Sequence, residues 1–258
     1  MRTRDENKSR LGVVIVAAGT SQRMTGVNKL FASLNRKPVL AWPVDTCQKH
    51  RSVRQIVLVL NHEDLARGDR LTKEKEWSKV TLCRGGTRRQ DSVKEGLRQL
   101  KDCDWVMIHD GARPFLTVNL IEDGLKAACR FGAAVAAVPV KDTIKLADTS
   151  NLIKETPERK RLWAAQTPQI FELGIITRAY ENLTTEVTDD STAVERLGYK
   201  VTLYMGNYEN IKVTTPEDLA RRHHIPLKDA GLYLRSLVLI GEGNDYFGKR
   251  GTVSPADR

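Results

Sequence analysis

Continuous apolar runs recur along the chain, separated by amphipathic stretches of helical length. The first run, at 13–16, contains only β-branched residues, which is typical of a strand buried on both faces of a parallel sheet. Pro43 is expected to delay or kink the first predicted helix, which would start at Pro38. The pattern predicts strands at 13–16, 54–60, 80–83, 104–108, 133–138 and 200–205, and helices that start at Pro38 and span 62–78, 92–100, 118–130, 172–182 and 188–197, the last capped by Thr188.

Strands alternating with helices predict an α/β fold with a doubly wound, mostly parallel sheet. Residues 139–163 break this alternation, because two short alternating segments flank a turn at 148–151. They predict a protruding β-hairpin arm. Such an arm has little to pack against in its own chain, so we expect it to pack on a second copy in a homodimer. The expected organisation is a flexible lead at 1–10, one domain at 11–225, and a tail at 226–258 whose order and role the sequence leaves open.

Four of the predicted strand ends carry small or charged residues. Ligands bind at the carboxyl ends of strands in open α/β sheets, so these ends are expected to converge on one crevice. Glycines and cations suit a polyphosphate there. The four groups are Ala17, Ala18 and Gly19 with Arg23 and Lys29; Gly85 and Gly86 with Arg89 and Ser92; Asp110 with Arg113; and Asn210 with Lys212.

Each group also has an ordinary structural explanation. The first stretch matches neither the P-loop nor the dinucleotide fingerprint, so it could be a buried strand followed by a solvated basic loop. Asp110 follows an apolar strand, where a carboxylate is costly to bury unless it is paired or bound to a cation. It could bind Mg²⁺ with phosphate oxygens, form a salt bridge to Arg113, or do both. Ser92 could cap a helix, and His109 is expected to be a core residue.

Composition narrows the class of protein. No apolar run is long enough for a transmembrane helix, and the charged start of the chain has no secretory pattern, so we expect a cytoplasmic protein. Four scattered cysteines fit reduced thiols. The net charge of +10 suits nucleic acid or small phosphorylated substrates. The basic residues are dispersed and aromatic residues make up only 6%, so a platform for stacking bases is poorly supplied, but the charge alone does not decide between the two kinds of ligand.

Seven segments, taken in order, resemble the 2-C-methyl-D-erythritol 4-phosphate cytidylyltransferase family of the non-mevalonate isoprenoid pathway. The resemblance runs from about residue 11 to about residue 220. The segments are VIVAAGTSQRM with Lys29, GGTRRQDSV, HDGARPF, VPVKDTIK, LWAAQTPQIF, VTDDSTAVE and NIKVTTPEDL.

This resemblance implies a Rossmann-like nucleotidyltransferase that transfers CMP from CTP to 2-C-methyl-D-erythritol 4-phosphate and releases pyrophosphate. Arg23 and Lys29 would stabilise the transition state, and Asp110 would bind Mg²⁺. Arg159 and Lys212 would hold the attacking phosphate. The implied substrate-binding residues are Ala17, Ala18, Gly19, Gly86, Arg89, Ser92, Gly111, Arg113, Thr143, Thr167 and Thr188, of which Thr143, like Arg159, would serve the site of a second subunit.

The chain departs from the family pattern in the first segment. The family usually has glycine where Ser21 stands and proline where Asn28 stands, and the loop between Met24 and Lys29 is one residue shorter. Ribitol-5-phosphate cytidylyltransferases share most of these segments, although the residues at 161–163 favour methylerythritol phosphate. A nucleic-acid-binding protein and a nucleotide-binding protein without catalysis remain as alternatives from other classes.

Overall fold

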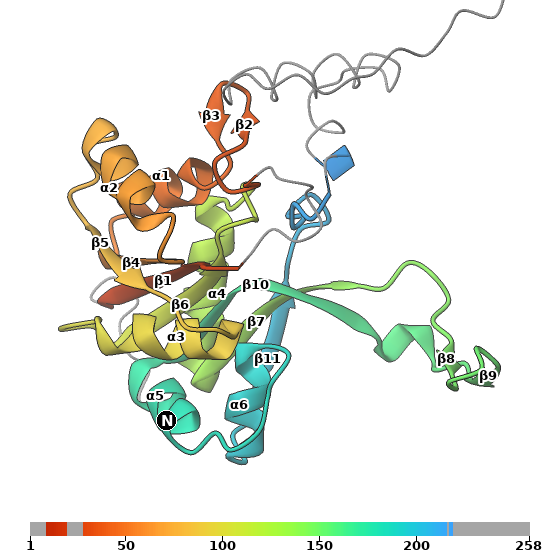
Figure 1. Cartoon of the computed structure of the whole chain (residues 1–258). Coiled ribbons are helices and arrows are strands. Elements are labelled where there is room, and N and C mark those ends of the chain that lie inside the picture. The colour runs from red at the N-terminus through yellow and green to blue at the C-terminus, as the bar shows by residue number, and fades with distance from the viewer. Residues whose placement is uncertain (1–8, 20–27, 216, 219–258) are drawn as a thin grey trace, which may run out of the picture.

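A seven-stranded sheet forms the centre of the molecule, as the computed structural model shows for residues 9–19, 28–215 and 217–218 (Figure 1). Its strand order is β11-β7-β10-β6-β1-β4-β5, and only β10 runs antiparallel to its neighbours in the described part. The predicted α/β fold with a mostly parallel sheet is therefore confirmed. The strands are β1 (Leu11–Ala17), β4 (Val53–Leu60), β5 (Val80–Arg84), β6 (Trp105–Asp110), β7 (Ala133–Pro139), β10 (Trp163–Glu172) and β11 (Thr202–Met205).

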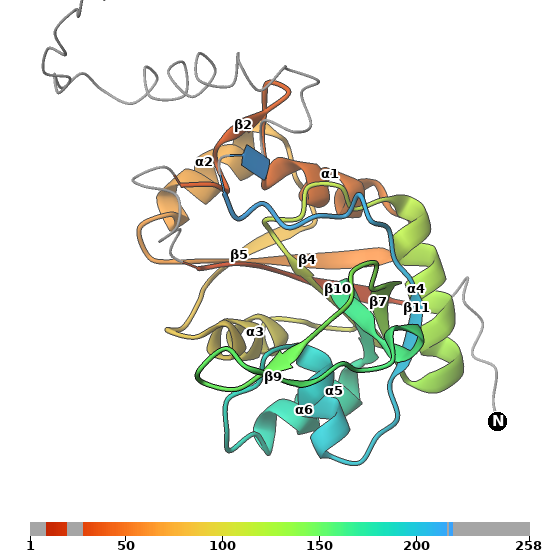
Figure 2. The same cartoon turned by 90° about the vertical axis from the view of Figure 1, so that its right-hand side faces the viewer.

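Helices cover both faces of this sheet (Figure 2). Helices α1 (Ala41–Lys49), α2 (Leu65–Glu74) and α4 (Val118–Phe131) pack on one face, and α3 (Arg89–Arg98), α5 (Leu173–Glu181) and α6 (Asp190–Arg196) pack on the other. Successive side chains of β1 serve the two cores in turn, because Val13 and Ile15 join the first and Val14 joins the second. Among the helices described, none is long and apolar enough to cross a membrane.

The first helix begins later than the sequence pattern predicts. Pro38 belongs to the two-residue strand β3 (Lys37–Pro38), which pairs with β2 (Ser33–Leu34), and α1 begins only at Ala41. The backbone N–H groups of Val39 and Leu40 donate to the carbonyls of Ala32 and Leu30, which ties this segment to the turn before β2. Pro43 lies in the first turn of α1, where a missing backbone N–H costs little, and the helix begins later than Pro38, which is one of the two effects expected of Pro43.

The cap of α6 is also different from the predicted one. The Asp189 carboxylate accepts the Thr192 backbone N–H at 3.0 Å and the Thr192 hydroxyl at 2.6 Å. Thr188 lies one residue earlier and is exposed, so its assignment as the cap was wrong. Aspartate and threonine are both good caps, and the sequence alone could not place the helix start to one residue.

The predicted arm is present as the hairpin of β8 (Leu146–Ala147) and β9 (Ile153–Glu155), which projects away from the sheet and helices (Figure 1). The Asp148 carboxylate closes the turn by accepting the backbone N–H groups of Ser150 and Leu152. A short 3₁₀ helix, Arg159–Arg161, leads the chain back to β10. The boundaries predicted at residues 10 and 225 stay predictions, because most of both tails lies outside the described residues.

Candidate active site at the carboxyl edge of the sheet

The strand directions bring the four suspected strand ends to one edge. Strand β10 is antiparallel to both β6 and β7, so β7 and its parallel neighbour β11 run in the same direction as β1, β4, β5 and β6. The chain order also reverses about β1, because β4 and β5 lie on one side and β6 on the other. Val16 of β1 is in register with Asp110 of β6 at this point. Such a reversal is where open α/β sheets bind ligands.

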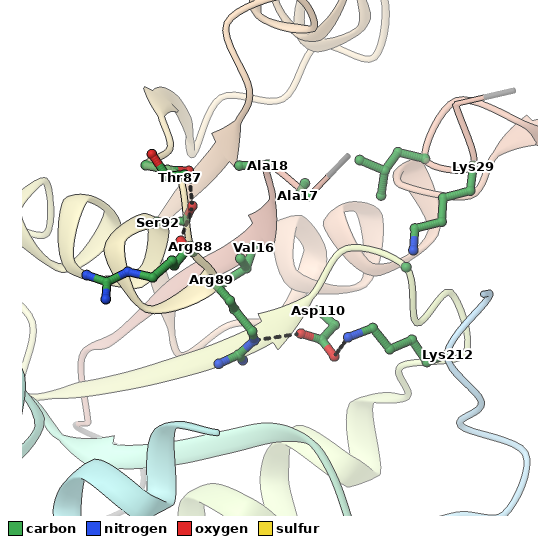
Figure 3. A pocket seen from close by; sticks show the side chains of 14 residues that line it. Val16, Ala17, Ala18, Lys29, Thr87, Arg88, Arg89, Ser92, Asp110 and Lys212 are labelled. Carbon is green, nitrogen blue, oxygen red and sulfur yellow. Dashed lines mark hydrogen bonds and ion pairs between the residues drawn. The ribbon is translucent and has the colours of Figure 1, made fainter. Parts of the chain in front are cut away.

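A cavity lies at this edge, and Figure 3 shows side chains pointing into it from opposite sides. Each of the four strand ends contributes to its wall, so the predicted convergence is confirmed. The wall also includes the start of α3, and the positive end of the helix dipole there favours an anion. The lining residues are Val16, Ala17, Ala18, Gly19, Lys29, Leu30, Gly86, Thr87, Arg88, Arg89, Ser92, Asp110, Ala112 and Lys212.

Asp110 is the one carboxylate among the described residues that line this cavity, and three cations surround it. Its Oδ2 lies 2.9 Å from the Lys212 Nζ and 3.5 Å from the Arg113 Nε, and its Oδ1 lies 3.3 Å from the Arg89 Nε. Burial would raise the pKa of Asp110, but the charges of Arg89, Lys212 and Arg113 hold it well below its ordinary value. Asp110 is therefore ionised, and the predicted salt bridge to Arg113 is one of three.

Arg89 is held by a second carboxylate behind the cavity. Its two terminal nitrogens bond Asp190 at 3.0 and 2.8 Å, and the Tyr180 hydroxyl donates to Asp190 Oδ1 at 2.6 Å. Asp190 has no exposed surface. Burial would lower the pKa of Arg89, but Asp190 and Asp110 raise it above its ordinary value. The guanidinium thus stays charged between two carboxylates, in a fixed orientation.

A buried series of hydrogen bonds, on the side away from the cavity, holds the backbone of Asp110 in place. The Asp110 backbone N–H donates to the Thr167 hydroxyl at 3.0 Å, and this hydroxyl lies 3.1 Å from the His109 Nδ1. The His109 Nε2 lies 3.1 Å from the Arg113 carbonyl, which can only accept. Burial lowers the pKa of His109 to about 4, so the ring is neutral and carries its proton on Nε2. His109 is thus a satisfied core residue, as expected.

The glycines near the cavity differ in what they make room for. A Cβ on Gly85 would lie 2.4 Å from the Ala18 Cβ, and one on Gly86 would lie 2.4 Å from the Asp91 Cβ, so packing within the chain requires both glycines. A Cβ on Gly19 would meet no described atom within 4 Å. Gly19 therefore borders open space beside the cavity. Ser92 does not cap α3, which begins at Arg89, and its hydroxyl donates to carbonyls of the preceding turn.

Several predicted site residues lie outside the cavity wall. Gly111 packs against β1, and Arg113 and Thr167 are behind Asp110. Thr143 and Arg159 lie on the arm, both exposed, and Thr188 is exposed before α6. Arg23 and Ser21 fall outside the described residues.

The sequence pattern gave no indication of Asp190 and Tyr180 as supports of Arg89. The pair of aspartates at 189–190 is ambiguous, because acidic residues at a helix start usually serve as caps or complement the helix dipole. Here Asp189 caps α6 and Asp190 points into the protein toward Arg89. Which of the two aspartates caps α6 and which one pairs with Arg89 depends on the packing of α5 and α6 against α3.

Comparisons with known proteins agree with this geometry. The family model for 2-C-methyl-D-erythritol 4-phosphate cytidylyltransferase matches residues 11–226. The enzyme of that name from Dehalococcoides mccartyi strain 195 is 48% identical over 211 residues, covering 81% of this chain and 93% of its own. The one from Caldanaerobacter subterraneus is 45% identical over 216 residues, covering 81% and 95%.

A solved structure has the same architecture. The crystal structure of 4-diphosphocytidyl-2C-methyl-D-erythritol synthase from Anaerococcus prevotii superposes with a TM-score of 0.75 at 30% identity, covering 89% of this chain and 97% of that one. The family match extends over most of the chain and includes every strand of the sheet. The chain therefore belongs to the 2-C-methyl-D-erythritol 4-phosphate cytidylyltransferase family.

Proposed function

We propose that the cavity binds CTP and transfers CMP to 2-C-methyl-D-erythritol 4-phosphate, giving 4-diphosphocytidyl-2-C-methyl-D-erythritol and pyrophosphate. One observation carries this proposal beyond family membership. Lys29, Arg89 and Lys212 line one cavity with the start of α3, at the point where the strand order reverses. Three cations and a helix N-terminus suit a polyphosphate and a second phosphorylated substrate.

The nucleotide would lie along the ends of β1 and β5. Ala17, Ala18 and Gly19 leave the backbone open to close approach. A second hollow, lined by Asn61, His62, Arg84, Gly85, Gly86, Thr87 and Glu95, shares Gly86 and Thr87 with the first cavity. An elongated ligand can therefore extend past Gly86, with its phosphates beside Lys29 and its nucleoside near Ser92.

The chemistry requires little beyond alignment and charge neutralisation. The acceptor phosphate is already largely a dianion near neutral pH, because the second pKa of a phosphate monoester is about 6. One of its oxygens forms a bond to the α-phosphorus of CTP, and the bond from that phosphorus to the bridging β-phosphate oxygen breaks to release pyrophosphate. Lys29 would stabilise the charge at the α-phosphate. Arg23 would share this role, but it lies outside the described residues.

We further propose that Mg²⁺ binds together with the nucleotide. No group of three or more His, Cys, Asp or Glu side chains in the described ranges could hold a metal ion. Asp110 provides one carboxylate whose oxygens face Arg89 and Lys212, so an added cation needs the negative charge of phosphates to be stable there. Mg²⁺ bound through one carboxylate, substrate phosphates and water fits this donor set. Asp110 would hold the ion, which would neutralise phosphate oxygens.

The acceptor would be held partly by a second subunit. The arm carries Thr143 and Arg159 away from the body, and the Arg159 Nη1 donates to the Lys141 carbonyl at the base of the arm. Lys212 and Thr188 would complete the contacts from the subunit that holds the nucleotide. Arg113 and Thr167 would act indirectly, since both are engaged in supporting Asp110.

The arm also carries the argument for a homodimer. Its apolar side chains are exposed in the single chain, with Leu152 at 66% and Ile153 at 63%. The adjoining Trp163 and the β11 residues Leu203 and Met205 are exposed as well. A second copy would cover these surfaces by a symmetric exchange of arms.

A cytoplasmic location also belongs to this proposal, because the four cysteines are all free, as expected in a reducing compartment.

Pyrophosphate release tests the proposed function. We expect release with CTP, Mg²⁺ and methylerythritol 4-phosphate, little with ATP, GTP or UTP, and little with ribitol 5-phosphate as acceptor. Preference for ribitol 5-phosphate would replace the proposed substrate. Binding of CTP without release, whatever the acceptor, would indicate a nucleotide-binding protein. Salt-sensitive binding of oligonucleotides without turnover would favour a nucleic-acid-binding protein.

A further inference from the structure

Asn28, which directly precedes Lys29, is tied to the protein by both its side chain and its backbone. Its Nδ2 donates to the Asp64 Oδ2 at 2.7 Å, and its Oδ1 accepts the Leu30 backbone N–H at 3.1 Å. Its carbonyl accepts the backbone N–H groups of Phe31 and Ala32, each at 3.1 Å. Proline at this position would fix φ, but it could neither donate to Asp64 nor accept from Leu30.

Asp64 is itself a fixed anchor. It is 7% exposed, and its Oδ2 also accepts the Asn61 Nδ2 at 2.8 Å, while its backbone N–H donates to the Asn61 Oδ1 at 2.8 Å. Asn61 follows the last residue of β4, and Asp64 directly precedes α2. The side chain of Asn28 is therefore bonded, through a charge-assisted hydrogen bond, to the turn that connects β4 to α2.

This arrangement holds the backbone of Lys29 from both sides. On the other side, the Leu30 side chain is 2% exposed and its carbonyl accepts the Leu40 backbone N–H at 2.9 Å. Figure 3 shows the Lys29 side chain entering the cavity from the side opposite Arg89 and Ser92. The direction of this long side chain depends on where its backbone is held.

We propose that Asn28 and Asp64 are positioning residues, which fix Lys29 where it can act on the α-phosphate of the nucleotide. The inference rests on the proposed function, in which Lys29 stabilises the charge formed there. Neither residue lines the cavity, so both act through Lys29. Because transition-state stabilisation depends on placement more steeply than substrate binding does, the effect belongs mainly to kcat.

Steady-state kinetics of Asn28→Ala tests the role of this pair. We expect kcat to fall about tenfold or more, with a smaller change in the KM for CTP. Asn182→Ala is the matched control, because Asn182 makes an exposed side-chain bond to the Arg178 carbonyl and does not line the cavity. In a Lys29→Ala background, Asn28→Ala should lower kcat no further. Multiplicative effects of the two substitutions, or a normal kcat for Asn28→Ala, would overturn the inference.

An exchange of the two side chains separates positioning from general damage. Asn28→Asp places two carboxylates together and should lower kcat at least as much as Asn28→Ala. Adding Asp64→Asn restores one donor and one acceptor and should recover most of kcat; no recovery would contradict the pairing.

If the wild type proves inactive, the proposed function fails. Hydrogen exchange then tests separately whether Asn28 holds the backbone that follows it. Asn28→Ala should speed exchange of the amides at 30–32, and unchanged exchange would overturn the anchor.

Discussion

At the scale of single residues, the site depends on buried charges that compensate one another. Asp110 pairs with Arg89, Arg89 with Asp190, and Asp190 accepts from Tyr180. A buried ion costs several kcal/mol unless its partners remain, so removal of one member affects the others. The consequence for catalysis is that Arg89 and Asp110 have little freedom to move before substrates bind.

Lys29→Ala should abolish most of kcat and change the KM for the acceptor far less. Lys29 lines the cavity and is proposed to act on the α-phosphate of the nucleotide, whereas the acceptor is proposed to contact Lys212 and Arg159. Loss of a preorganised donor at the reacting phosphate costs about a hundredfold or more in rate. Initial-rate measurements with CTP and acceptor each varied would check this, and a near-normal kcat would remove Lys29 from the mechanism.

Asp190→Asn should destabilise the protein by about 3 kcal/mol, because it leaves the partly buried Arg89 short of a compensating charge. Tyr180 can still donate to the amide oxygen, so the loss reports mainly on Arg89. Glu95→Gln is the control: it breaks an exposed ion pair with Arg98 and should cost less than about 1 kcal/mol. Urea-induced unfolding of both variants compares them, and equal stability would contradict the role of Asp190.

At the scale of elements, helix ends place several of the site residues. The start of α3 carries Arg89, and α6 begins with Asp190, whose carboxylate orients Arg89. The Asp189 cap fixes α6 through the Thr192 N–H, and it also accepts from Gln169 of β10 at 3.0 Å. The cap thereby connects α6 to the central sheet and helps to keep Asp190 facing Arg89.

Asp189→Ala should lower the free energy of unfolding by about 1 kcal/mol near neutral pH, and Thr188→Ala should change it little. Burial would raise the pKa of Asp189, but hydrogen bonds from Thr192, Gln169 and Ser191 lower it below its ordinary value. The cap's contribution is complete above about pH 4 and is lost as the pH falls through the lowered pKa. Urea unfolding at several pH values should show the difference from wild type shrinking in acid. A larger loss for Thr188→Ala would contradict the structure.

The strand ends were predictable from sequence, whereas the supports behind them were not. Buried parallel strands give continuous apolar runs. A charged residue at the end of such a run, such as Asp110, can therefore be recognised in the sequence. The role of Asp190 depends on the packing of α5 and α6, which no local pattern contains. The start of α1 was misplaced because proline suits the first turn of a helix and an edge strand equally.

At the scale of the whole molecule, we propose that a second subunit completes the site. The arm extends from between β7 and β10, and its residues Thr143 and Arg159 are exposed and line neither of the two hollows at the carboxyl edge of the sheet. Its exposed apolar side chains, such as Leu152 and Ile153, have no core of their own. Arm exchange would bury these residues and bring Arg159 to the cavity of the partner.

Mixed dimers test this exchange. Arg159→Ala alone should raise the KM for the acceptor, and Lys29→Ala alone should lose turnover. In a dimer of one chain of each kind, one cavity has both defects and the other has none. Unfolding and refolding the two variants together should therefore restore up to about a quarter of the wild-type sites under subsaturating acceptor. No gain over the separate variants would contradict sharing between subunits.

The central claim is CMP transfer in the cationic cavity, and the ³¹P NMR spectrum of the reaction mixture tests it most directly. With CTP, Mg²⁺ and methylerythritol 4-phosphate, the account predicts that the acceptor monoester and CTP signals decrease together. Pyrophosphate and a diphosphate diester should increase in equal amounts, and Lys29→Ala should slow all four changes equally. Formation of CMP and pyrophosphate without the diester, or an unchanged spectrum with the folded wild-type protein, would contradict the account.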